Sequence, residues 1–208
     1  MRAASRIQTA RTCRQPRRSG AVFLEFIVAM PILFFAFLAI FEFSFAMIAV
    51  DTSTTAVVQG AREGAFGYAT GVVLNNNGVG PGPGAGTDPT GNDDIADQVA
   101  LLMDKYLDVI NVEIRQTGVN DDPAKPNAYV LITHGGVTVE RGDTTLACTH
   151  STGLVVPQPS EIVVTLCYPL VDSTNPMGVG NPVPDWLASV GFSLATYRFE
   201  TTSRALLE

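Results

Sequence analysis

An uncharged and strongly apolar run near the N-terminus constrains this chain more than any other feature. Residues 26–41 contain no charged side chain, and beyond Glu42 residues 43–50 are apolar except for Ser44. A helix that spans a bilayer needs about 20 mostly apolar residues. Residues 22–50 supply them, with Glu25 near one end and Glu42 well inside. The run therefore predicts one transmembrane helix in a single-pass protein.

The charged residues are distributed unevenly around this run. The chain of 208 residues carries a net charge of −7, yet residues 1–20 contain six arginines and no acidic residue. Because positively charged flanks stay in the cytoplasm, we expect a cytoplasmic N-terminus and a C-terminal domain outside the cytoplasm. A protein that binds nucleic acid carries basic residues on its folded domain. Here that domain is acidic, so we expect no nucleic-acid partner.

Three interpretations of the run compete. A cleaved secretory signal has an apolar stretch of about 7–15 residues followed by a small-residue cleavage site. This run is longer, and Phe45-Ala46-Met47 makes a poor site. The second interpretation is an ordinary single-pass anchor whose outer domain binds a ligand or a component of the cell envelope. The third places a cut before the run, and the residues at its start favour it.

The start of the run carries a short pattern of its own. A basic leader ends in Gly20, and counting from Ala21 the fifth residue is Glu25 and the sixth is Phe26. This pattern resembles the processing site of type IV pilin-like proteins. Further motifs fall in the order and spacing seen in TadE-like proteins, which are minor pilin-like components of the tight-adherence (Flp) pilus machinery. These motifs are Glu25-Phe26, Pro31, Ile40-Phe41-Glu42-Phe43 and Ala61-Arg62-Glu63-Gly64-Ala65.

The resemblance implies a pseudopilin of the bacterial inner (cytoplasmic) membrane that acts in pilus assembly, without enzymatic activity and without a cofactor. It implies that a prepilin peptidase cuts between Gly20 and Ala21, and that Glu25 and Phe26 serve processing and assembly. The other expected partners are the lipid bilayer, further Tad pilus-assembly proteins reached through the membrane helix, and other copies of the chain.

Glu25 needs a physical reason to lie at the edge of a bilayer. A carboxylate at the bilayer centre costs about 2.5–3.5 kcal/mol on insertion scales. In pilin-like filaments the equivalent glutamate is thought to meet the freed α-amino group of the mature chain, which here belongs to Ala21. The alternative is that Glu25 simply reaches the lipid headgroups. Glu42 lies farther from Ala21, and we expect its substitution to have the milder effect.

Helix-disrupting residues and composition divide the chain. Pro31 lacks a backbone donor and is expected to kink the helix, and Gly64 and Gly67 are expected to mark where the helix fades. We expect four parts: a basic leader over residues 1–20, the transmembrane helix and its extension over 21–66, a Gly/Pro/Asn-rich loop over 67–92 and an extracytoplasmic α+β domain over 93–208.

The outer domain shows one helical pattern followed by strand-like runs. A helix capped by Asn92 or Asp93 is expected to place Ile95, Val99, Leu102, Met103, Tyr106 and Ile110 on one face. Strand-like runs occupy residues 112–115, 128–133, 137–140, 161–170 and 195–202, and His134-Gly135-Gly136 predicts a hairpin turn. This order predicts an α+β fold with one helix on an antiparallel sheet, an outline that pilin-like subunits share.

Few residues offer the chemistry of a site. Cys148 and Cys167 are expected to form a disulfide in an oxidising compartment, with two buried free thiols as the alternative. We expect no metal, because no zinc or calcium spacing is complete around Cys148, His150 and Cys167 or around Asp88, Asn92, Asp93 and Asp94. We also find no catalytic constellation, which argues against a secreted hydrolase.

Overall fold

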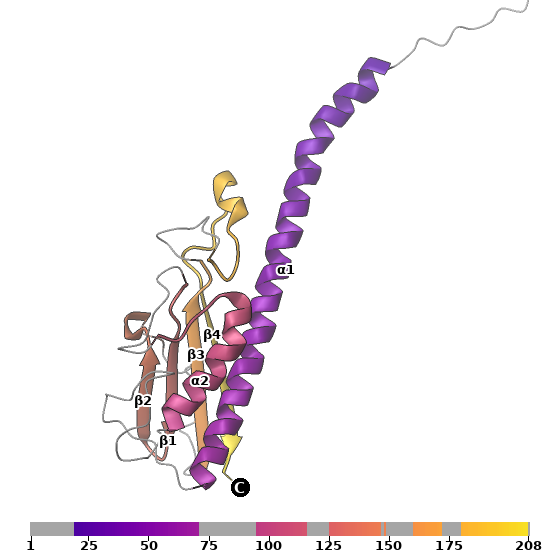
Figure 1. The fold of residues 1–208 in the computed structure, drawn as a ribbon. Helices are drawn as coiled ribbons and strands as arrows, with labels where there is room; N and C mark the ends of the chain where they lie inside the picture. The colour runs from indigo at the N-terminus through magenta and orange to yellow at the C-terminus, as the bar shows by residue number, and fades with distance from the viewer. Residues whose placement is uncertain are drawn as a thin grey trace, which may run out of the picture. The chain divides into compact units, whose positions relative to one another are not determined.

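The apolar run forms the first part of one long helix. In a computed structural model of the chain, α1 spans Ser19–Ala69 without interruption (Figure 1). Among the residues that the structure describes, α1 is the one helix long and apolar enough to cross a membrane. The predicted long apolar helix is therefore confirmed. α1 ends at Ala69, two residues after Gly67, so the helix ends close to where Gly64 and Gly67 were expected to mark its fading.

The structure describes residues 19–70, 95–115, 125–146, 148, 160–171 and 180–207. Most of the basic leader and of the Gly/Pro/Asn-rich loop lies outside the described residues. The same holds for Asp88, Asn92, Asp93, Asp94 and His150. The chain divides into two units, Met1–Phe37 and Leu38–Glu208. The first holds the N-terminal part of α1, and the second holds the rest of α1 and all the other elements.

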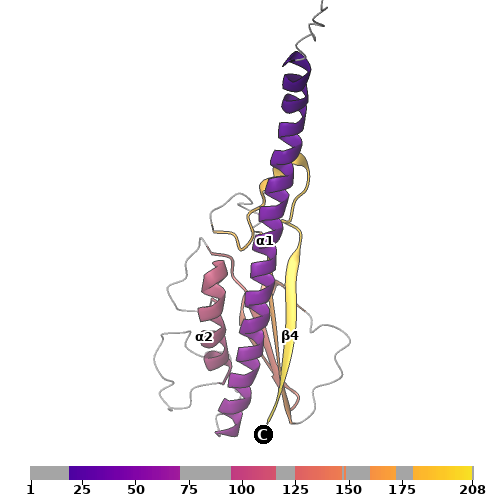
Figure 2. The ribbon, with the colours of Figure 1, turned by 90° about the vertical axis from the view of Figure 1, so that its right-hand side faces the viewer.

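The second unit combines helices with an antiparallel sheet (Figure 2). Helix α2 spans Ile95–Leu107 and leads into the 3-10 helix η1, Asp108–Ile110. Four strands lie in the order β2-β1-β3-β4, and each neighbouring pair is antiparallel. The remaining bounds are Tyr129–His134 (β1), Val137–Gly142 (β2), Thr144–Leu146 (η2), Glu161–Pro169 (β3), Trp186–Val190 (η3) and Arg198–Leu206 (β4). The α+β class with a helix on an antiparallel sheet is confirmed.

Local sequence sets the hairpin between β1 and β2. His134 pairs with Val137, and the two residues between them, Gly135 and Gly136, have φ values of 57° and 83°. Positive φ at both central positions belongs to a type I′ turn, which glycine adopts without steric cost. The predicted hairpin is confirmed.

The strand predicted over residues 112–115 is wrong. Glu113 forms only an isolated parallel bridge with Asn127. Its N–H donates to the carbonyl of Pro126, and its carbonyl accepts from the N–H of Ala128. The next ladder bond towards residue 115 does not form, because the N–H of Arg115 donates instead to the side-chain Oδ1 of Asn127 at 2.8 Å.

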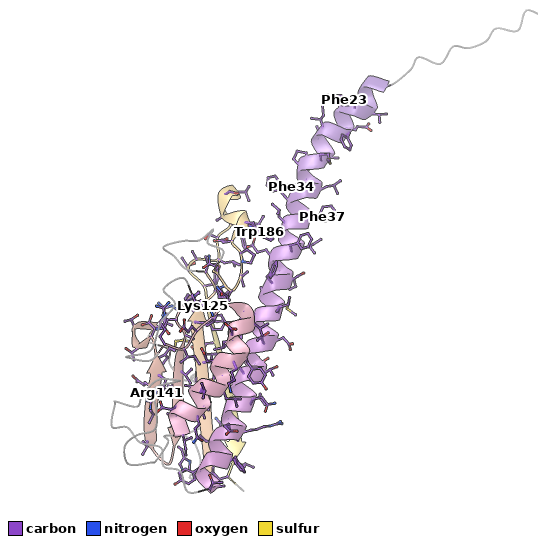
Figure 3. The ribbon with its side chains drawn as sticks, in the orientation of Figure 1. Phe23, Phe34, Phe37, Lys125, Arg141 and Trp186 are labelled. Carbon is purple, nitrogen blue, oxygen red and sulfur yellow. A yellow bond between two sulfur atoms is a disulfide. The ribbon has the colours of Figure 1, made fainter. Side chains whose placement is uncertain are left out.

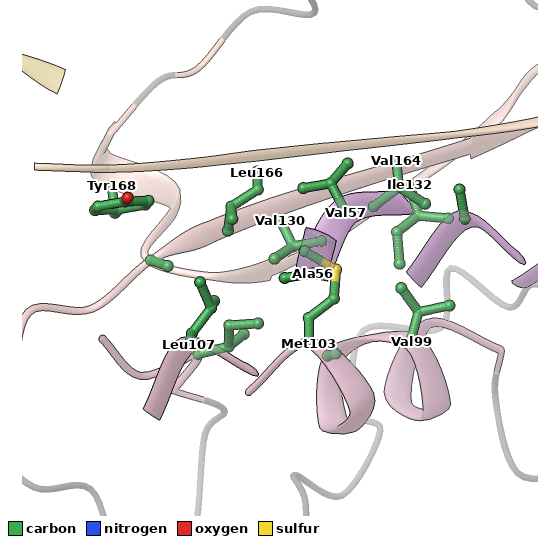
Figure 4. Close-up of a cluster of buried hydrophobic side chains, with 14 of the residues drawn as sticks. Ala56, Val57, Val99, Met103, Leu107, Val130, Ile132, Val164, Leu166 and Tyr168 are labelled. Carbon is green, nitrogen blue, oxygen red and sulfur yellow. The ribbon is translucent and has the colours of Figure 1, made fainter. Parts of the chain in front are cut away.

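Helices α1 and α2 cover one face of the sheet (Figures 1 and 2). Their side chains meet alternate residues of the strands, because successive residues of a strand point to opposite faces. The core on this face includes Val57, Val99, Met103, Leu107, Val130, Ile132, Val164, Leu166 and Tyr168 (Figure 4). Tyr129, Leu131 and Cys167 form a smaller cluster on the other face.

Two glycines let α1 approach this core closely. A Cβ atom at Gly60 would lie 2.8 Å from Sδ of Met103 on α2, and one at Gly64 would lie 2.6 Å from Cδ1 of Ile162 on β3. Residues four apart share one face of a helix. Gly60 and Gly64 therefore form the part of α1 that faces α2 and β3.

Candidate functional site

The N-terminal part of α1 exposes apolar side chains on all sides. Every side chain from Val22 to Phe37 is exposed, and Phe23, Phe34 and Phe37 project away from the helix (Figure 3). Soluble monomers rarely expose so large a continuous apolar surface. This apolar surface is favourable only where lipid hydrocarbon chains or other apolar helices cover it.

The predicted processing and assembly residues lie in the first turns of this helix. Gly20 is exposed, and a Cβ atom placed on it meets no atom within 4 Å. Ala21 follows it in the helix, and Glu25 and Phe26 are both exposed. Among the described residues, no hydrogen bond or ion pair engages the Glu25 carboxylate. That carboxylate can reach either lipid headgroups or an amine.

Pro31 lies inside α1, and the helix continues on both sides of it. The ring nitrogen carries no hydrogen, so the carbonyl of Ile27, one turn earlier, receives no helical hydrogen bond from it. The kink expected at Pro31 stays a prediction.

Glu42 has different surroundings from Glu25. Glu42 is buried, with 3% of its surface exposed. Its Oε2 accepts a hydrogen bond from the N–H of Leu187 at 3.2 Å. Its Oε1 has no hydrogen-bond partner among the described residues. One turn later, the rings of Phe45 and Trp186 meet edge to face with their centroids 5.9 Å apart. The structure thus removes the Glu42 charge from the exposed surface of α1.

The segment that covers Glu42 is organised by a second buried carboxylate. Asp185 is fully buried and directly precedes η3. Its Oδ2 accepts hydrogen bonds from the hydroxyl of Ser193 at 2.7 Å and from the N–H of Leu194 at 3.2 Å. Residues 185–197, called the η3 segment below, are therefore folded back onto Asp185.

Cys148 and Cys167 are joined by a disulfide, with their Cα atoms 6.4 Å apart. Cys167 lies on β3 opposite Tyr129 of β1, in the cluster on the sheet face away from α1 and α2. The bridge therefore fastens residue 148 to the centre of the sheet. It stabilises the domain and contributes no binding group.

The described residues contain no group of three or more His, Cys, Asp and Glu side chains that could hold a metal ion. His134 is buried at the end of β1, where its Nδ1 donates to the carbonyl of Glu161 at 2.9 Å. Its ring lies against that of Tyr68, with the centroids 4.1 Å apart. His134 is thus engaged in packing β1 against α1 and β3.

The structure brings Glu42, Phe45 and the η3 segment together, whereas Gly20 and Glu25 are exposed in the first turns of α1. Sequence reasoning missed the η3 segment. The available signal was Trp186, the only tryptophan of the chain, within a stretch almost free of charge. No protein-family model matches the chain, and no curated protein or solved structure shows a significant similarity to it.

Proposed function

We propose that this protein is a TadE-like pseudopilin of the bacterial inner membrane that acts in the assembly of a Flp (tight-adherence) pilus. The observation that carries the proposal is the spacing of Gly20, Ala21 and Glu25 at the start of a helix in which residues 26–37 are all apolar and exposed. A prepilin peptidase cuts after Gly20, and the mature chain begins at Ala21.

The exposed apolar residues of α1 support a role in the membrane. A helix of residues 22–41 is about 30 Å long, which equals the thickness of the hydrocarbon core. The six arginines before it orient the N-terminus towards the cytoplasm. The α+β domain, packed on the later part of α1, then works outside the cytoplasm.

Glu25 supplies the assembly contact in this proposal. Cleavage creates a new α-amino group at Ala21, within about one turn of the Glu25 carboxylate. A charge in hydrocarbon is costly unless it is paired, so a carboxylate and an amine at the same depth attract each other strongly. The pair forms within one chain or between neighbouring chains, and it links processing to assembly with other Tad proteins.

Processing is the most direct test. The full chain is produced in cells that hold a prepilin peptidase, and its N-terminus is determined by mass spectrometry. We expect a mature chain that begins at Ala21, and a Gly20→Leu variant that keeps the basic leader. Because Gly20 has open space around it, the variant should fold normally. Ala39→Leu, an equally exposed change on the same helix, is the matched control and should be processed.

The outcome also separates the two main interpretations. A chain that keeps Met1 in the presence of the peptidase contradicts the pseudopilin proposal and favours an ordinary single-pass anchor. Orientation is tested separately with a reporter that is active only in the cytoplasm, fused after Glu208. The reporter should be silent, and strong activity would reverse the proposed topology.

A further inference from the structure

The η3 segment presents large apolar side chains to its surroundings at one end of the domain. Trp186 is 39% exposed, Val190 53%, Phe192 55% and Tyr197 56%. In Figure 1, η3 lies at the end of the domain opposite the C-terminus. These side chains are not needed to fill the core, so their exposure calls for a partner that is itself apolar.

The segment also lacks charge. Asp185 is the only charged residue between Ser173 and Tyr197. It is fully buried, and its Oδ2 is engaged by Ser193 and Leu194. The exposed surface of the η3 segment therefore carries no formal charge, and placing it against lipid costs no desolvation of an ion.

Two contacts hold the η3 segment at one level of α1. The N–H of Leu187 donates to Oε2 of Glu42 at 3.2 Å, and Trp186 lies edge to face against Phe45. The start of η3 is thus fixed beside residues 42–45 of the helix.

The side of α1 left free at this level is apolar. Phe43, Met47 and Ile48 are exposed there, and the first exposed charge beyond them is that of Asp51. Residues 22–50 of a helix are about 43 Å long. The roughly 30 Å hydrocarbon core takes up residues 22–41, and the remaining residues 42–50 extend about 13 Å beyond it on the outer side. Residues 42–50 therefore correspond to the outer interfacial region.

We infer that the η3 segment lies in the outer interfacial region of the bilayer that α1 spans, with Trp186, Val190 and Phe192 in contact with lipid. Tryptophan and tyrosine favour this region because their rings are apolar and carry a polar edge. The inference rests on the proposed membrane anchoring of α1 and adds a second lipid contact, made by the domain itself.

Trp186 is the only tryptophan of the chain, so it reports on its own surroundings without labelling. The full chain is reconstituted at low density in phosphatidylcholine vesicles, and its fluorescence is measured with lipids brominated either near the headgroup end or near the methyl end of the acyl chain. We expect strong quenching of Trp186 by the shallow bromines and weaker quenching by the deep ones. Lipid quenching, rather than the emission maximum, is the readout, because contact with Phe45 alone shifts the emission.

Two reporter variants calibrate depth in a Trp186→Phe background. Phe34→Trp places the probe in the middle of the apolar run, and deep bromines should quench it most. Phe66→Trp places the probe on an exposed position of α1 about 36 Å beyond Glu42, and no lipid should quench it. Both positions are exposed, so neither variant disturbs the core.

The outcomes are distinct. If Phe34→Trp is quenched while Trp186 is open to aqueous acrylamide and untouched by lipid, the inference is overturned and the anchoring stands. If Trp186 is shielded from both lipid and acrylamide, a protein surface covers the η3 segment and the inference is also overturned. If Phe34→Trp itself escapes lipid quenching, the membrane anchoring fails, and the inference fails with it.

Discussion

The hydroxyl oxygens of Ser53 and Tyr168 lie 2.7 Å apart in the core, where they join α1 to β3. Both residues are fully buried. The Tyr168 hydroxyl donates to the carbonyl of Ala49 at 3.3 Å, so the Ser53 hydroxyl is the donor between the two side chains. A buried hydroxyl without a partner costs about 1–3 kcal/mol. Any shift of α1 along β3 that broke this bond would therefore be unfavourable, so the bond helps to fix the helix on the sheet.

We expect Ser53→Ala and Tyr168→Phe each to lower the free energy of unfolding by about 1 kcal/mol. Both remove the same bond, so the double variant should lose less than the sum. Urea unfolding of the full chain in detergent, followed by circular dichroism, measures these values. Thr55→Ala, which removes an exposed hydroxyl bond to the carbonyl of Asp51, is the control and should change little. Strictly additive losses would contradict a direct bond.

The same tyrosine predicts how stability depends on alkaline pH. Burial raises the pKa of Tyr168 from 10.0 to about 12, against a smaller opposing effect of the Ser53 hydrogen bond. The unfolded chain therefore loses the proton near pH 10, while the folded chain holds it to higher pH. Linkage then requires the free energy of unfolding to fall as pH rises from 10 towards 12. Two pKa units correspond to about 3 kcal/mol.

Urea unfolding at a series of alkaline pH values checks this direction. Tyr129, whose pKa burial also raises to about 12, contributes with the same sign. The Tyr168→Phe variant should therefore show a shallower decline than the parent, and it should not abolish the decline. A parent whose stability stays level between pH 10 and 12 would contradict the buried, protonated state of both rings.

Gly64 tests how closely α1 packs on the sheet. Its Cβ position lies 2.6 Å from Cδ1 of Ile162. Gly64→Ala should be almost neutral, because the flexible end of Ile162 yields and alanine favours helix by about 1 kcal/mol. Gly64→Leu should lower the free energy of unfolding by about 1–3 kcal/mol, because an overpacked core strains its neighbours. Ala39→Leu, at an exposed position of the same helix, is the control for thermal unfolding and should leave the midpoint unchanged.

Local patterns were sufficient for much of this fold. The spacing of Ile95, Val99 and Met103 predicted the buried face of α2, and Gly135-Gly136 predicted a hairpin turn. The last strand was predicted from residue 195, whereas β4 begins at Arg198. The pattern of side chains in one segment does not show where its backbone hydrogen bonds to a neighbouring strand begin and end. For the same reason the strand predicted over residues 112–115 is wrong.

Long-range contacts could not be predicted in this way. The sequence presents Glu42 as a charge in an apolar run, with no sign that Leu187, 145 positions later, donates to it. It presents Gly64 as a residue that weakens a helix, whereas its small size admits Ile162. In a sequence, a charge within an apolar run and a glycine within a helix both indicate that another segment packs closely there. Neither of them identifies which segment it is. For Glu42 this weakens the expectation of a mild substitution, because Glu42→Gln alters a buried hydrogen-bonded group.

The disulfide predicts a measurable loss of stability on reduction. Cys148 and Cys167 are 19 positions apart, and closing a loop of this size stabilises a fold by about 3 kcal/mol in the chain-entropy model. We expect Cys148→Ser to lower the midpoint of thermal unfolding and to make the protein insensitive to reductant. In protein made without a prepilin peptidase, which keeps residues 1–20, Cys13→Ser is the control and should not change the midpoint. Two free thiols in non-reducing mass mapping of protein from its native compartment would reject the bridge.

Glu25 carries the sharpest functional prediction. If its carboxylate pairs with the freed amine of Ala21 in poorly hydrated surroundings, removing one partner typically costs 3–5 kcal/mol, because the other charge is left uncompensated. Glu25→Gln should therefore leave membrane insertion and cleavage largely intact but impair co-purification with pilus-assembly partners and abolish piliation. If Glu25 only reaches headgroups, the substitution changes little.

Asp51→Asn is the matched control for Glu25→Gln. It neutralises a carboxylate on the same helix that is also exposed but lies about 39 Å farther along the axis. Both variants lose one negative charge, so a difference between them reports position and not net charge. We expect Asp51→Asn to assemble pili normally, as counted by electron microscopy of cells with equal amounts of each variant. If the Glu25 variant assembles pili as well as the parent, the pairing with Ala21 has no role in assembly, and an ordinary membrane anchor is the better account of α1.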